Sequence, residues 1–389
     1  MKKPIKVLHL STHYEDCGVG KYQEQFLEHM EHAKIDSIEN KFFGYSPNKT
    51  RLMSKDGLSI VLKELQQELD SFDILHIQHE FSFYAQDEFV KFCQVAVESK
   101  KQLIVTYHTS PAFVIKTPHL GGLGPRSILH FLRAIRYKRR MVARHIKPAF
   151  QADLVIAHNQ TTIDALVAFG ISPQRIKKLQ LPVPKIKEYE DTSQEIQGAL
   201  RTSPSDVIFC TVGFMHRFKG LFDAVKALRY LPPNYKLAIV GGISPTSDDH
   251  QIYNKITDLV ADCGLQDRVY ITGFVKDDVR LDKLIQECDV CIYPYDKTYY
   301  AGVSSASMNI AFSNKMPVIA YPVQTFVEIE QSSGAIELTN GFSYYELART
   351  LKTADLTTLK EKSQDYAKAE SYSVITHDLV KIYEEVVSN

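Results

Sequence analysis

No apolar run in the sequence reaches the roughly 18 residues that a membrane-spanning helix needs. The N-terminal stretch MKKPIKVLHLST lacks both the long hydrophobic region and the small-residue cleavage site of a signal peptide. The chain also has no excess of charge, because 46 lysines and arginines balance 46 aspartates and glutamates. A neutral chain has no overall positive field to attract nucleic acid. We therefore expect a cytoplasmic protein without a nucleic-acid partner.

Cysteine is sparse, with six residues in 389. Cys288 and Cys291 form a Cys-x-x-Cys pair within the apolar run DVCIYPY, and neither a second pair nor a histidine cluster accompanies it. This pattern favours buried thiols in a reducing compartment over a metal or redox site. We predict no bound metal and no cofactor other than a co-substrate.

The chain alternates short apolar runs with helical patterns, over a length sufficient for two or three domains. Helical patterns lie at Ile60–Leu69, Ile252–Cys263 and Leu281–Cys288. The expected strands are Lys6–Leu10, Ile74–Ile77, Leu103–Tyr107, Leu154–Ala157, Val207–Thr211, Lys236–Val240, Val269–Thr272, Val290–Tyr293 and Pro317–Ala320. Such strands are typical of parallel sheets covered by helices on both faces. Leu181–Asp206, rich in proline, serine and charge, marks a linker between two Rossmann-like halves.

The stretch VIFCTVGFMHRFKG, residues 207–220, carries the strongest indication of a ligand. A strand ends at Gly213, and the cations Arg217 and Lys219 precede a helical pattern that opens at Gly220. A glycine turn and a helix N-terminus with two cations suit a diphosphate, which backbone amides and the helix dipole also favour. The alternative is two ordinary surface cations on a loop.

Other glycines follow expected strands in the same way. The first strand leads to CGVGKY, which contains Gly18 and Gly20, and later strands lead to Gly242 and Gly273. Glycine lets a backbone pass close to a ligand, but a tight strand-to-helix turn explains any single one of them equally well.

Taken in order, these motifs resemble the retaining nucleotide-sugar glycosyltransferases of family four, which have the GT-B fold. The likeness covers roughly Val207–Tyr321 through GFMHRFKGLFDAVKAL, LAIVGG, RVYITGFV, CDVCIYPY and MPVIAY. It extends more loosely to CGVGKY, HIQHEFSFY, TYHTSP and ADLVIAHNQTTIDALVAFGI, and to SVITHDLVKIYEEV at the end. The resemblance implies an α/β fold of two doubly wound, parallel-sheet domains that face each other across a cleft. We expect an acceptor domain at 1–185, a donor domain at 186–370, and a closing helix at 371–389 that packs back on the first domain.

The resemblance also implies roles for particular residues. Arg217 and Lys219 would hold the donor diphosphate, and preorganised cations of this kind stabilise the charge of the leaving group. His108 would face the donor sugar, whereas an alternative is a histidine satisfied within the structure. The expected donor contacts also include Gly18, Val19, Gly20, Gly213, Gly242, Gly273 and Phe274, the last two near the base. His79 and Glu80 would face the acceptor, although Glu80 could instead accept hydrogen bonds from nearby backbone amides.

One departure from the family pattern concerns two glutamates that usually stand eight positions apart before the Pro-Val-Ile-Ala segment. Their positions fall on Gly302 and Ile310, and neither residue is acidic. Polar residues remain nearby, and we expect Ser304 and Ser305 to contact the donor at a helix N-terminus, with Ser307 and Asn309 close by. The loss is consistent with an unusual donor or with an inactive homologue.

Charge is distributed unevenly, since residues 99–152 contain no aspartate or glutamate but eleven lysines and arginines. Within them, ILHFLRAIRYKRRMVARHI has apolar residues at helical spacing. A basic amphipathic helix is typical of an anionic membrane surface. The cations expected there are Arg133, Arg136, Arg139, Arg140 and Arg144. The alternatives are an ordinary helix with one core face, and a nucleic-acid patch.

These observations predict transfer of a sugar from a nucleotide-diphosphate sugar to a glycan or lipid-linked acceptor, with retention and without a metal. The resemblance places this reaction in bacterial surface polysaccharide synthesis, in the cytoplasm and peripherally on the inner face of the plasma membrane. The leaving phosphate itself would help to deprotonate the acceptor. Two alternatives stay open: an inactive binding subunit, favoured by the missing glutamates, and a nucleotide-sugar epimerase, for which the segments offer few acid–base groups.

Overall fold

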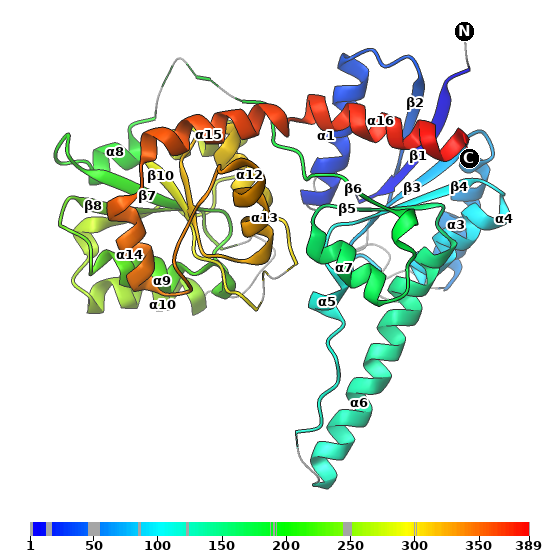
Figure 1. Cartoon of the computed structure of the whole chain (residues 1–389), viewed down its shortest axis with the longest axis horizontal. Helices are drawn as coiled ribbons and strands as arrows, with labels where there is room; N and C mark the ends of the chain where they lie inside the picture. Colours follow the sequence, from blue (N-terminus) through cyan, green and yellow to red (C-terminus); the bar gives the residue numbers. More distant parts are fainter. Residues whose placement is uncertain are drawn as a thin grey trace. The chain divides into compact units, whose positions relative to one another are not determined.

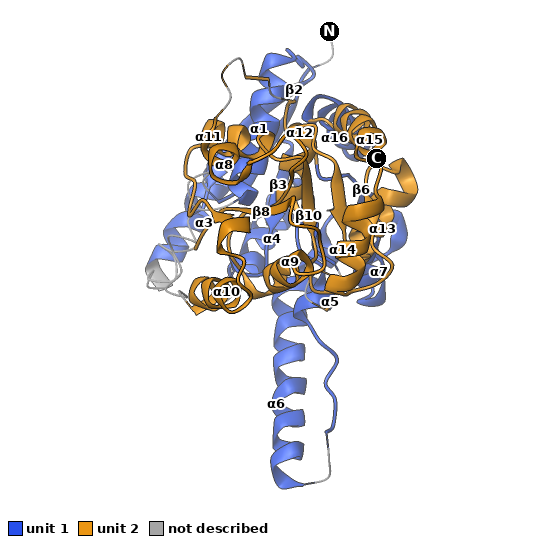
Figure 2. Cartoon of the chain, turned by 90° about the vertical axis from the view of Figure 1, so that its left-hand side faces the viewer, with its two compact units in different colours: residues 1–181, 302–304, 372–389 blue, residues 182–301, 305–371 orange. Residues whose placement is uncertain are grey.

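The computed structural model describes residues 3–12, 18–45, 55–84, 87–121, 124–186, 188–189, 191, 193–243, 251–298, 300 and 302–388. The chain divides into two compact units, coloured separately in Figure 2. Unit 1 comprises residues 1–181, 302–304 and 372–389, and unit 2 comprises residues 182–301 and 305–371. In the described part of the chain, each unit is built on one six-stranded parallel sheet flanked by helices. The predicted α/β fold of two parallel-sheet domains is confirmed.

The sheet of unit 1 has the strand order β2-β1-β3-β4-β5-β6. Its strands are β1 (Ile5–Ser11), β2 (Ile38–Gly44), β3 (Ile74–His79), β4 (Gln102–Tyr107), β5 (Leu154–Ala157) and β6 (Ile176–Lys178). Its helices are α1 (Gly18–His32), α3 (Lys55–Leu69), α4 (Glu88–Glu98), α5 (Pro111–Val114), α6 (Pro125–Met141), α7 (Gln160–Ala168) and α16 (Tyr372–Ser388). Figure 1 shows β1 and β3 side by side in this sheet, and the strand order reverses between β1 and β3.

The sheet of unit 2 has the order β12-β11-β10-β7-β8-β9. Its strands are β7 (Val207–Val212), β8 (Tyr235–Val240), β9 (Val269–Ile271), β10 (Val290–Tyr293), β11 (Val318–Ala320) and β12 (Glu337–Leu338). Its helices are α8 (Glu195–Leu200), α9 (Leu221–Leu228), α10 (Gln251–Asp262), α11 (Asp278–Gln286), α12 (Ala306–Ser313), α13 (Gln324–Ser333), α14 (Tyr344–Thr353) and α15 (Leu356–Ala369). Strand order reverses between β7 and β10, and ligands of open α/β sheets bind beyond the carboxyl ends of strands at such a point.

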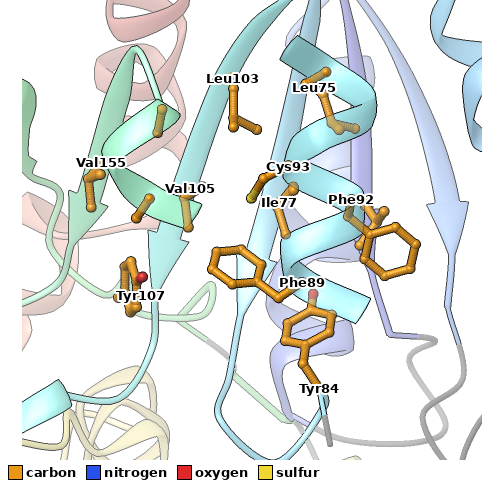
Figure 3. Packing of buried hydrophobic residues seen from close by; sticks show 14 of the residues in the cluster. Leu75, Ile77, Tyr84, Phe89, Phe92, Cys93, Leu103, Val105, Tyr107 and Val155 are labelled. Carbon is orange, nitrogen blue, oxygen red and sulfur yellow. The ribbon is translucent and has the colours of Figure 1, made fainter. Parts of the chain in front are cut away.

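Both faces of each sheet are buried, because neighbouring residues of one strand enter different cores. Leu75 and Ile77 of β3 pack in one cluster with α4, whereas Ile74 packs on the other face with α1 and α16. Figure 3 shows Phe89, Phe92 and Cys93 of α4 beside the strands of the first cluster. This burial on both faces explains the nearly continuous apolar runs of the central strands.

The closing helix α16 belongs to unit 1 and is held there by aromatic and polar contacts. Tyr372 stacks on His29 with ring centroids 5.2 Å apart and meets Phe26 edge-on. Tyr383 is fully buried, and its hydroxyl bonds Nδ1 of His76 at 2.7 Å. The last helix is thereby joined to β3 in the middle of the first sheet.

Candidate active site

The cationic loop of unit 2 places Lys219 against a group of hydroxyls. Lys219 lies in a 3-10 turn between β7 and α9, and its Nζ donates to Tyr295 Oη at 2.6 Å and to Ser307 Oγ at 3.1 Å. Tyr295 follows β10, so parallel pairing of β7 with β10 brings it near Lys219. Ser305 completes the group, since its Oγ lies 3.1 Å from Ser307 Oγ. We call Lys219, Tyr295, Ser305 and Ser307 the lysine–hydroxyl cluster.

No carboxylate balances this charge in the residues that the structure describes. Lys219 bonds only hydroxyl groups, and Ser305 is the N-cap of α12, where its side chain accepts from the Met308 amide. The N-terminus of a helix carries a partial positive charge. An ammonium group beside a helix N-terminus, with no counter-ion, is an arrangement that favours an anion such as phosphate.

Arg217 is the second predicted cation of this loop, and it is exposed to solvent. Its guanidinium lies 4.3 Å from the centre of the Phe218 ring, and no ion pair holds it within the described ranges. Its exposure leaves the Arg217 guanidinium open to an anion, but solvent weakens its interaction with that anion.

Close backbone packing at Gly242 and a positive φ at Gly213 explain two of the predicted glycines in unit 2. A Cβ on Gly242 would stand 2.4 Å from the Phe274 nitrogen, and the Gly242 carbonyl accepts from the Met215 amide at 2.8 Å. Gly213 has φ +108° and donates to the Val240 carbonyl. Gly242 therefore packs two loops together, which supports the turn alternative at this position rather than a direct ligand contact.

Gly273 and Phe274 form an open edge of the same region. Gly273 has φ +73°, and nothing lies within 4 Å of the position that a Cβ would occupy. The rings of Phe274 and Phe214 stack with centroids 5.9 Å apart and planes 10° from parallel. Both are exposed, at 43% and 49%. An exposed pair of parallel rings offers a flat apolar surface for another planar ring.

Gly220 is required by the geometry of the lysine loop. It has φ +70°, and a Cβ there would stand 1.8 Å from the Pro294 carbonyl oxygen. We expect Gly220→Ala to lower the free energy of unfolding by about 3 kcal/mol or more, because backbone overlap adds to the 1–2 kcal/mol of a left-handed alanine. Activity should fall as well, since Lys219 and Tyr295 each adjoin a clashing residue.

Gly264 provides the matched control for this prediction. It has a similar φ of +64°, but nothing lies within 4 Å of a Cβ there. Chemical denaturation of Gly264→Ala should therefore show only the backbone cost of about 1–2 kcal/mol. Equal losses in the two variants would show that the contact with Pro294 is not limiting.

In unit 1, His108 follows β4 and takes part in a chain of side-chain hydrogen bonds. Its Nε2 lies 2.8 Å from Gln78 Oε1, and its Nδ1 lies 3.2 Å from Nε2 of His158. Gln78 donates to Gln23, and Gln23 bonds Nδ1 of His9. These partners fix the imidazole ring of His108, which is half-buried.

Burial sets the protonation states of the histidines in this series of hydrogen-bonded side chains. Burial lowers the pKa of His108 well below its ordinary value, and the neighbouring histidines 158, 76 and 79 lower it further. Burial also lowers the pKa of His9 and of His158 to about 4 each. His108 is therefore neutral near pH 7, when it can donate one hydrogen bond and accept another.

The two residues predicted to face the acceptor are held inside unit 1. His79 is fully buried against Phe89 and Tyr107, and its Nε2 bonds His145, so this side chain lies in the core of unit 1. Glu80 accepts from the Phe81 amide at 2.9 Å and from the Thr109 hydroxyl. Burial raises the pKa of Glu80, and these hydrogen bonds oppose the rise. The structure therefore agrees with the alternative for Glu80, in which its carboxylate accepts hydrogen bonds from nearby backbone amides.

The glycine loop after β1 has only its last residues within the described part of the chain. Gly18, Val19 and Gly20 begin α1. The space beside Gly18 is open, with no atom within 4 Å of a Cβ position, whereas Val19 packs on the core and Gly20 is buried. Gly18 is thus the member of this group that leaves room for a ligand.

The serine loop before α12 is divided between the units. Ser304 belongs to unit 1, where its hydroxyl accepts from Asn159 Nδ2 at 3.0 Å, whereas Ser305 caps α12 in unit 2. Ser304 is therefore not a member of the lysine–hydroxyl cluster. A Cβ on Gly302 would stand 2.5 Å from Ser110 Cβ, and Ile310 packs on the core of unit 2. In this arrangement Gly302 leaves no room for a larger side chain, and Ile310 contributes to the core.

Comparison with protein families follows the same division of the chain. The model of "Glycosyltransferase Family 4" matches residues 24–183, and the model of "Glycosyl transferases group 1" matches residues 192–369. This chain is a glycosyltransferase of the family-four type. None of the curated proteins matches its sequence.

Solved structures show the fold of this glycosyltransferase. Anabaena Alr3699/HepE in complex with UDP has a TM-score of 0.70 at 15% identity, covering 98% of this chain and all of the other. A glycosyltransferase from Rickettsia africae has a TM-score of 0.70 at 14% identity and covers both chains fully. WaaG, a glycosyltransferase involved in lipopolysaccharide biosynthesis, has a TM-score of 0.60 at 14% identity, covering 97% and 99%. The likeness establishes the GT-B fold.

Sequence reasoning missed two residues of this glycosyltransferase's candidate site. Tyr295 supplies the shortest contact to Lys219, and Phe214 pairs with Phe274. Tyr295 follows β10 and Phe214 follows β7, and these two strands end at the same edge of the second sheet. Their positions directly after these strands are the sequence signal that could have identified them. In the described ranges, no group of three or more histidine, cysteine, aspartate or glutamate side chains is arranged to hold a metal ion.

Proposed function

We propose that the enzyme transfers a glycosyl group from a nucleoside-diphosphate sugar to a glycan or lipid-linked acceptor, with retention of anomeric configuration. The observation that carries this proposal is the lysine–hydroxyl cluster, in which Lys219 lies beside the N-terminus of α12 and has no carboxylate partner among the residues that the structure describes. The complexes of Alr3699/HepE with UDP and with UDP-glucose support a donor of this class.

Each part of the donor has a proposed partner in the chain. Lys219 and the cluster hydroxyls bind one phosphate, and the exposed Arg217 binds the other. The nucleobase stacks on the edge formed by Phe214 and Phe274, because a planar ring suits their exposed faces. His108 stays a proposed contact of the sugar, but its ring nitrogens bond Gln78 Oε1 and His158 Nε2 in this structure, so a sugar hydroxyl would have to replace one of these partners.

The proposed reaction needs no covalent intermediate with the protein. The bond between the anomeric carbon and the leaving diphosphate oxygen breaks, and a bond to the acceptor oxygen forms on the same face of the sugar. The acceptor's hydroxyl proton passes to an oxygen of the leaving diphosphate. Lys219 and Arg217 stabilise the charge that grows on that group. We further propose that these cations make a metal unnecessary, so that a chelator leaves the rate unchanged.

The setting that we propose is bacterial surface polysaccharide synthesis on the cytoplasmic side of the membrane. Two observations support it: the likeness to WaaG, which is involved in lipopolysaccharide biosynthesis, and the basic stretch between residues 99 and 152. A lipid-linked acceptor is presented at an anionic surface, where positive charge favours association.

Calorimetric titration with nucleoside diphosphates tests the donor site first. We expect one nucleoside diphosphate to bind selectively. At a concentration 100 times its dissociation constant, this ligand should raise the free energy of unfolding by about 2.7 kcal/mol. Arg217→Met should weaken this response. Silence across uridine, guanosine, adenosine, cytidine and thymidine diphosphates would contradict the proposal. Binding with no transfer from the corresponding sugar donors to any offered acceptor would instead support the inactive-homologue alternative.

A further inference from the structure

Three tyrosines of unit 2 gather where α9 and α14 pack side by side (Figures 1 and 2). Tyr230 follows the end of α9, and Tyr344 and Tyr345 are the first residues of α14. The ring centroid of Tyr345 lies 4.4 Å from those of both Tyr230 and Tyr344, and Tyr230 stacks on Tyr344 at 5.7 Å. We call these three residues the tyrosine platform.

The platform is open to solvent although its rings pack on one another. Tyr230 is 42% exposed and Tyr345 is 52% exposed, whereas Tyr344 also packs on the core of unit 2. The hydroxyls of Tyr230 and Tyr345 are 3.0 Å apart, and the hydrogen bond between them raises the pKa of Tyr230. Because neighbouring rings and this hydrogen bond restrict both side chains, a ligand would bind them at a small cost in side-chain entropy.

The charged side chains around the platform are largely engaged with their neighbours. Lys226 Nζ lies 5.6 Å from the centre of the Tyr344 ring, and Arg349 forms an ion pair with Glu346 at 2.6 Å. These two cations are therefore not counted among the ligand-binding groups. Arg229 is exposed and can donate several hydrogen bonds. The platform thus offers ring faces and hydrogen-bonding groups rather than a concentrated charge.

A sugar ring has the two properties that match this surface. The C–H groups of a pyranose form an apolar face, and this face can stack on an exposed aromatic ring. The hydroxyls at its edge can bond a phenol or a guanidinium group. Single exposed tyrosines are common on protein surfaces, but a packed group of three with two exposed rings indicates a binding surface. A neutral glycan is therefore the ligand that this chemistry favours.

The area of the platform argues against a second protein as its occupant. A fully buried aromatic side chain covers about 150–250 Å², so three partly exposed tyrosines provide at most about 300 Å². A stable protein interface needs about 800 Å² from each partner. The platform is too small for such an interface but large enough for a few sugar rings.

The platform is separate from the proposed donor site. Lys219 precedes the N-terminus of α9, whereas Tyr230 follows its C-terminus. The eight residues of α9 span about 12 Å along the helix axis. A sugar held by the lysine–hydroxyl cluster therefore cannot also stack on Tyr230, and the two sites bind different groups.

We propose that the tyrosine platform is a second carbohydrate-binding site, which holds a neutral glycan by stacking on Tyr230 and Tyr345. Arg229 and the two phenolic hydroxyls bond the sugar hydroxyls. The choice of a glycan rests on the proposed function, in which a glycan is the acceptor. A second contact of this kind keeps a polymeric acceptor at the enzyme between transfers, because it raises the local concentration of the chain end.

The platform can carry its own fluorescent reporter, because the chain contains no tryptophan. Tyr345→Trp keeps an aromatic ring in the platform, and Tyr253→Trp places a matched reporter on α10 at a tyrosine that is 38% exposed. The ligands are maltotriose, cellotriose and chitotriose, with sorbitol as an acyclic polyol that has no ring face. At least one trisaccharide should change the Tyr345→Trp emission in a saturable way. Sorbitol should leave this emission unchanged, and the Tyr253→Trp emission should respond to none of the four compounds.

Substitution of Tyr230 tests whether stacking provides the affinity. In the Tyr345→Trp background, Tyr230→Ala should weaken binding of the responding trisaccharide about fivefold, which is typical of the loss of one aromatic contact. Tyr230→Phe keeps the ring and should retain most of the affinity. Melting curves of these variants report whether unit 2 is intact. Calorimetry of the wild type with the same trisaccharide should give a dissociation constant similar to that of Tyr345→Trp.

Three results would overturn this inference. The first is an unchanged Tyr345→Trp emission with all three trisaccharides, together with no heat of binding in wild-type calorimetry. The second is equal affinity of the Tyr230→Ala variant and its parent. The third is a concentration-dependent dimer in light scattering that Tyr230→Ala dissociates, which would make a second copy of the chain the occupant.

The nucleoside-diphosphate titration of the wild type, run in parallel, separates failure of this inference from failure of the proposed function. A protein that binds a nucleoside diphosphate but none of the trisaccharides would lose the platform site and keep the proposed donor site. A protein that binds neither would contradict both.

Discussion

A Lys219→Met variant is expected to transfer sugar with a kcat about 10²–10³-fold below that of the wild type, which is the usual loss when one preorganised donor to a developing anion is removed. Lys219 donates to Tyr295 and Ser307 and has no carboxylate partner, so its charge is available to the donor diphosphate. That charge matters most when the bond to the leaving group breaks. The loss should therefore fall on kcat more than on KM.

Lys226→Met is the matched control, because Lys226 also lies near a tyrosine ring of unit 2, 5.6 Å from the centre of Tyr344, outside the lysine–hydroxyl cluster. Its kcat should stay within about twofold of the wild type, as expected for a surface substitution. Melting temperatures of both variants report whether unit 2 is intact. A Lys219→Met enzyme with unchanged kcat and a normal melting curve would remove Lys219 from the mechanism.

Arg217 offers an internal comparison for the same assay. Because its guanidinium is exposed, water screens its charge, and its removal should affect donor affinity more than kcat. Lys219 would then mainly stabilise the charge on the leaving diphosphate, and Arg217 would mainly contribute to donor binding.

The sequence was sufficient to predict the central strands and the edge strand β9, but not the other three edge strands. All nine expected strands are present. The ends of β1 and β7, for example, differ from the expected ends by no more than one residue. The three that were missed, β2, β6 and β12, lie at sheet edges. An edge strand has a neighbour on one side only, so IENKFFG and IKK can carry charge that a central strand cannot.

Local sequence was similarly informative about some site residues and silent about others. Lys219 could be predicted because the glycine turn, the cation and the helix start are adjacent in the chain. Tyr295 could not, because it is 76 positions away and reaches Lys219 through the pairing of β10 with β7. His79 shows the opposite limit, since a histidine at the end of a strand points into the core or out of it without any local difference in sequence.

Acid is expected to unfold unit 1 before unit 2. Burial lowers the pKa of His9 and of His158 from 6.5 to about 4, and within the described residues their hydrogen-bond partners are amides, a backbone carbonyl and a histidine rather than carboxylates. Between these values the unfolded chain binds more protons than the folded one, so stability rises with pH. Above pH 6.5 these two histidines do not lower the free energy of unfolding, and they lower it progressively as the pH falls towards 4.

The size of this effect is large for a single unit. A pKa displaced from 6.5 to about 4 corresponds to about 3 kcal/mol for each fully buried histidine, or roughly 6 kcal/mol for the two. A typical domain has a free energy of unfolding of about 5–15 kcal/mol. His145, whose pKa is also lowered to about 4, adds to the loss in unit 1. Unit 2 has one described histidine, His216, and it is exposed.

Hydrogen exchange followed by mass spectrometry separates the units in one experiment. After correction for intrinsic rates, peptides from β3 and β4 should lose protection between pH 6.5 and 4.5, while peptides from β7 and β8 keep theirs. His158→Asn sharpens the test, because its amide can still donate to the Leu179 carbonyl that His158 Nδ1 bonds at 2.9 Å, but it does not titrate. The slope of stability against pH in this variant should fall by about one proton. Parallel loss of protection in both units would mean that the buried histidines do not govern acid stability.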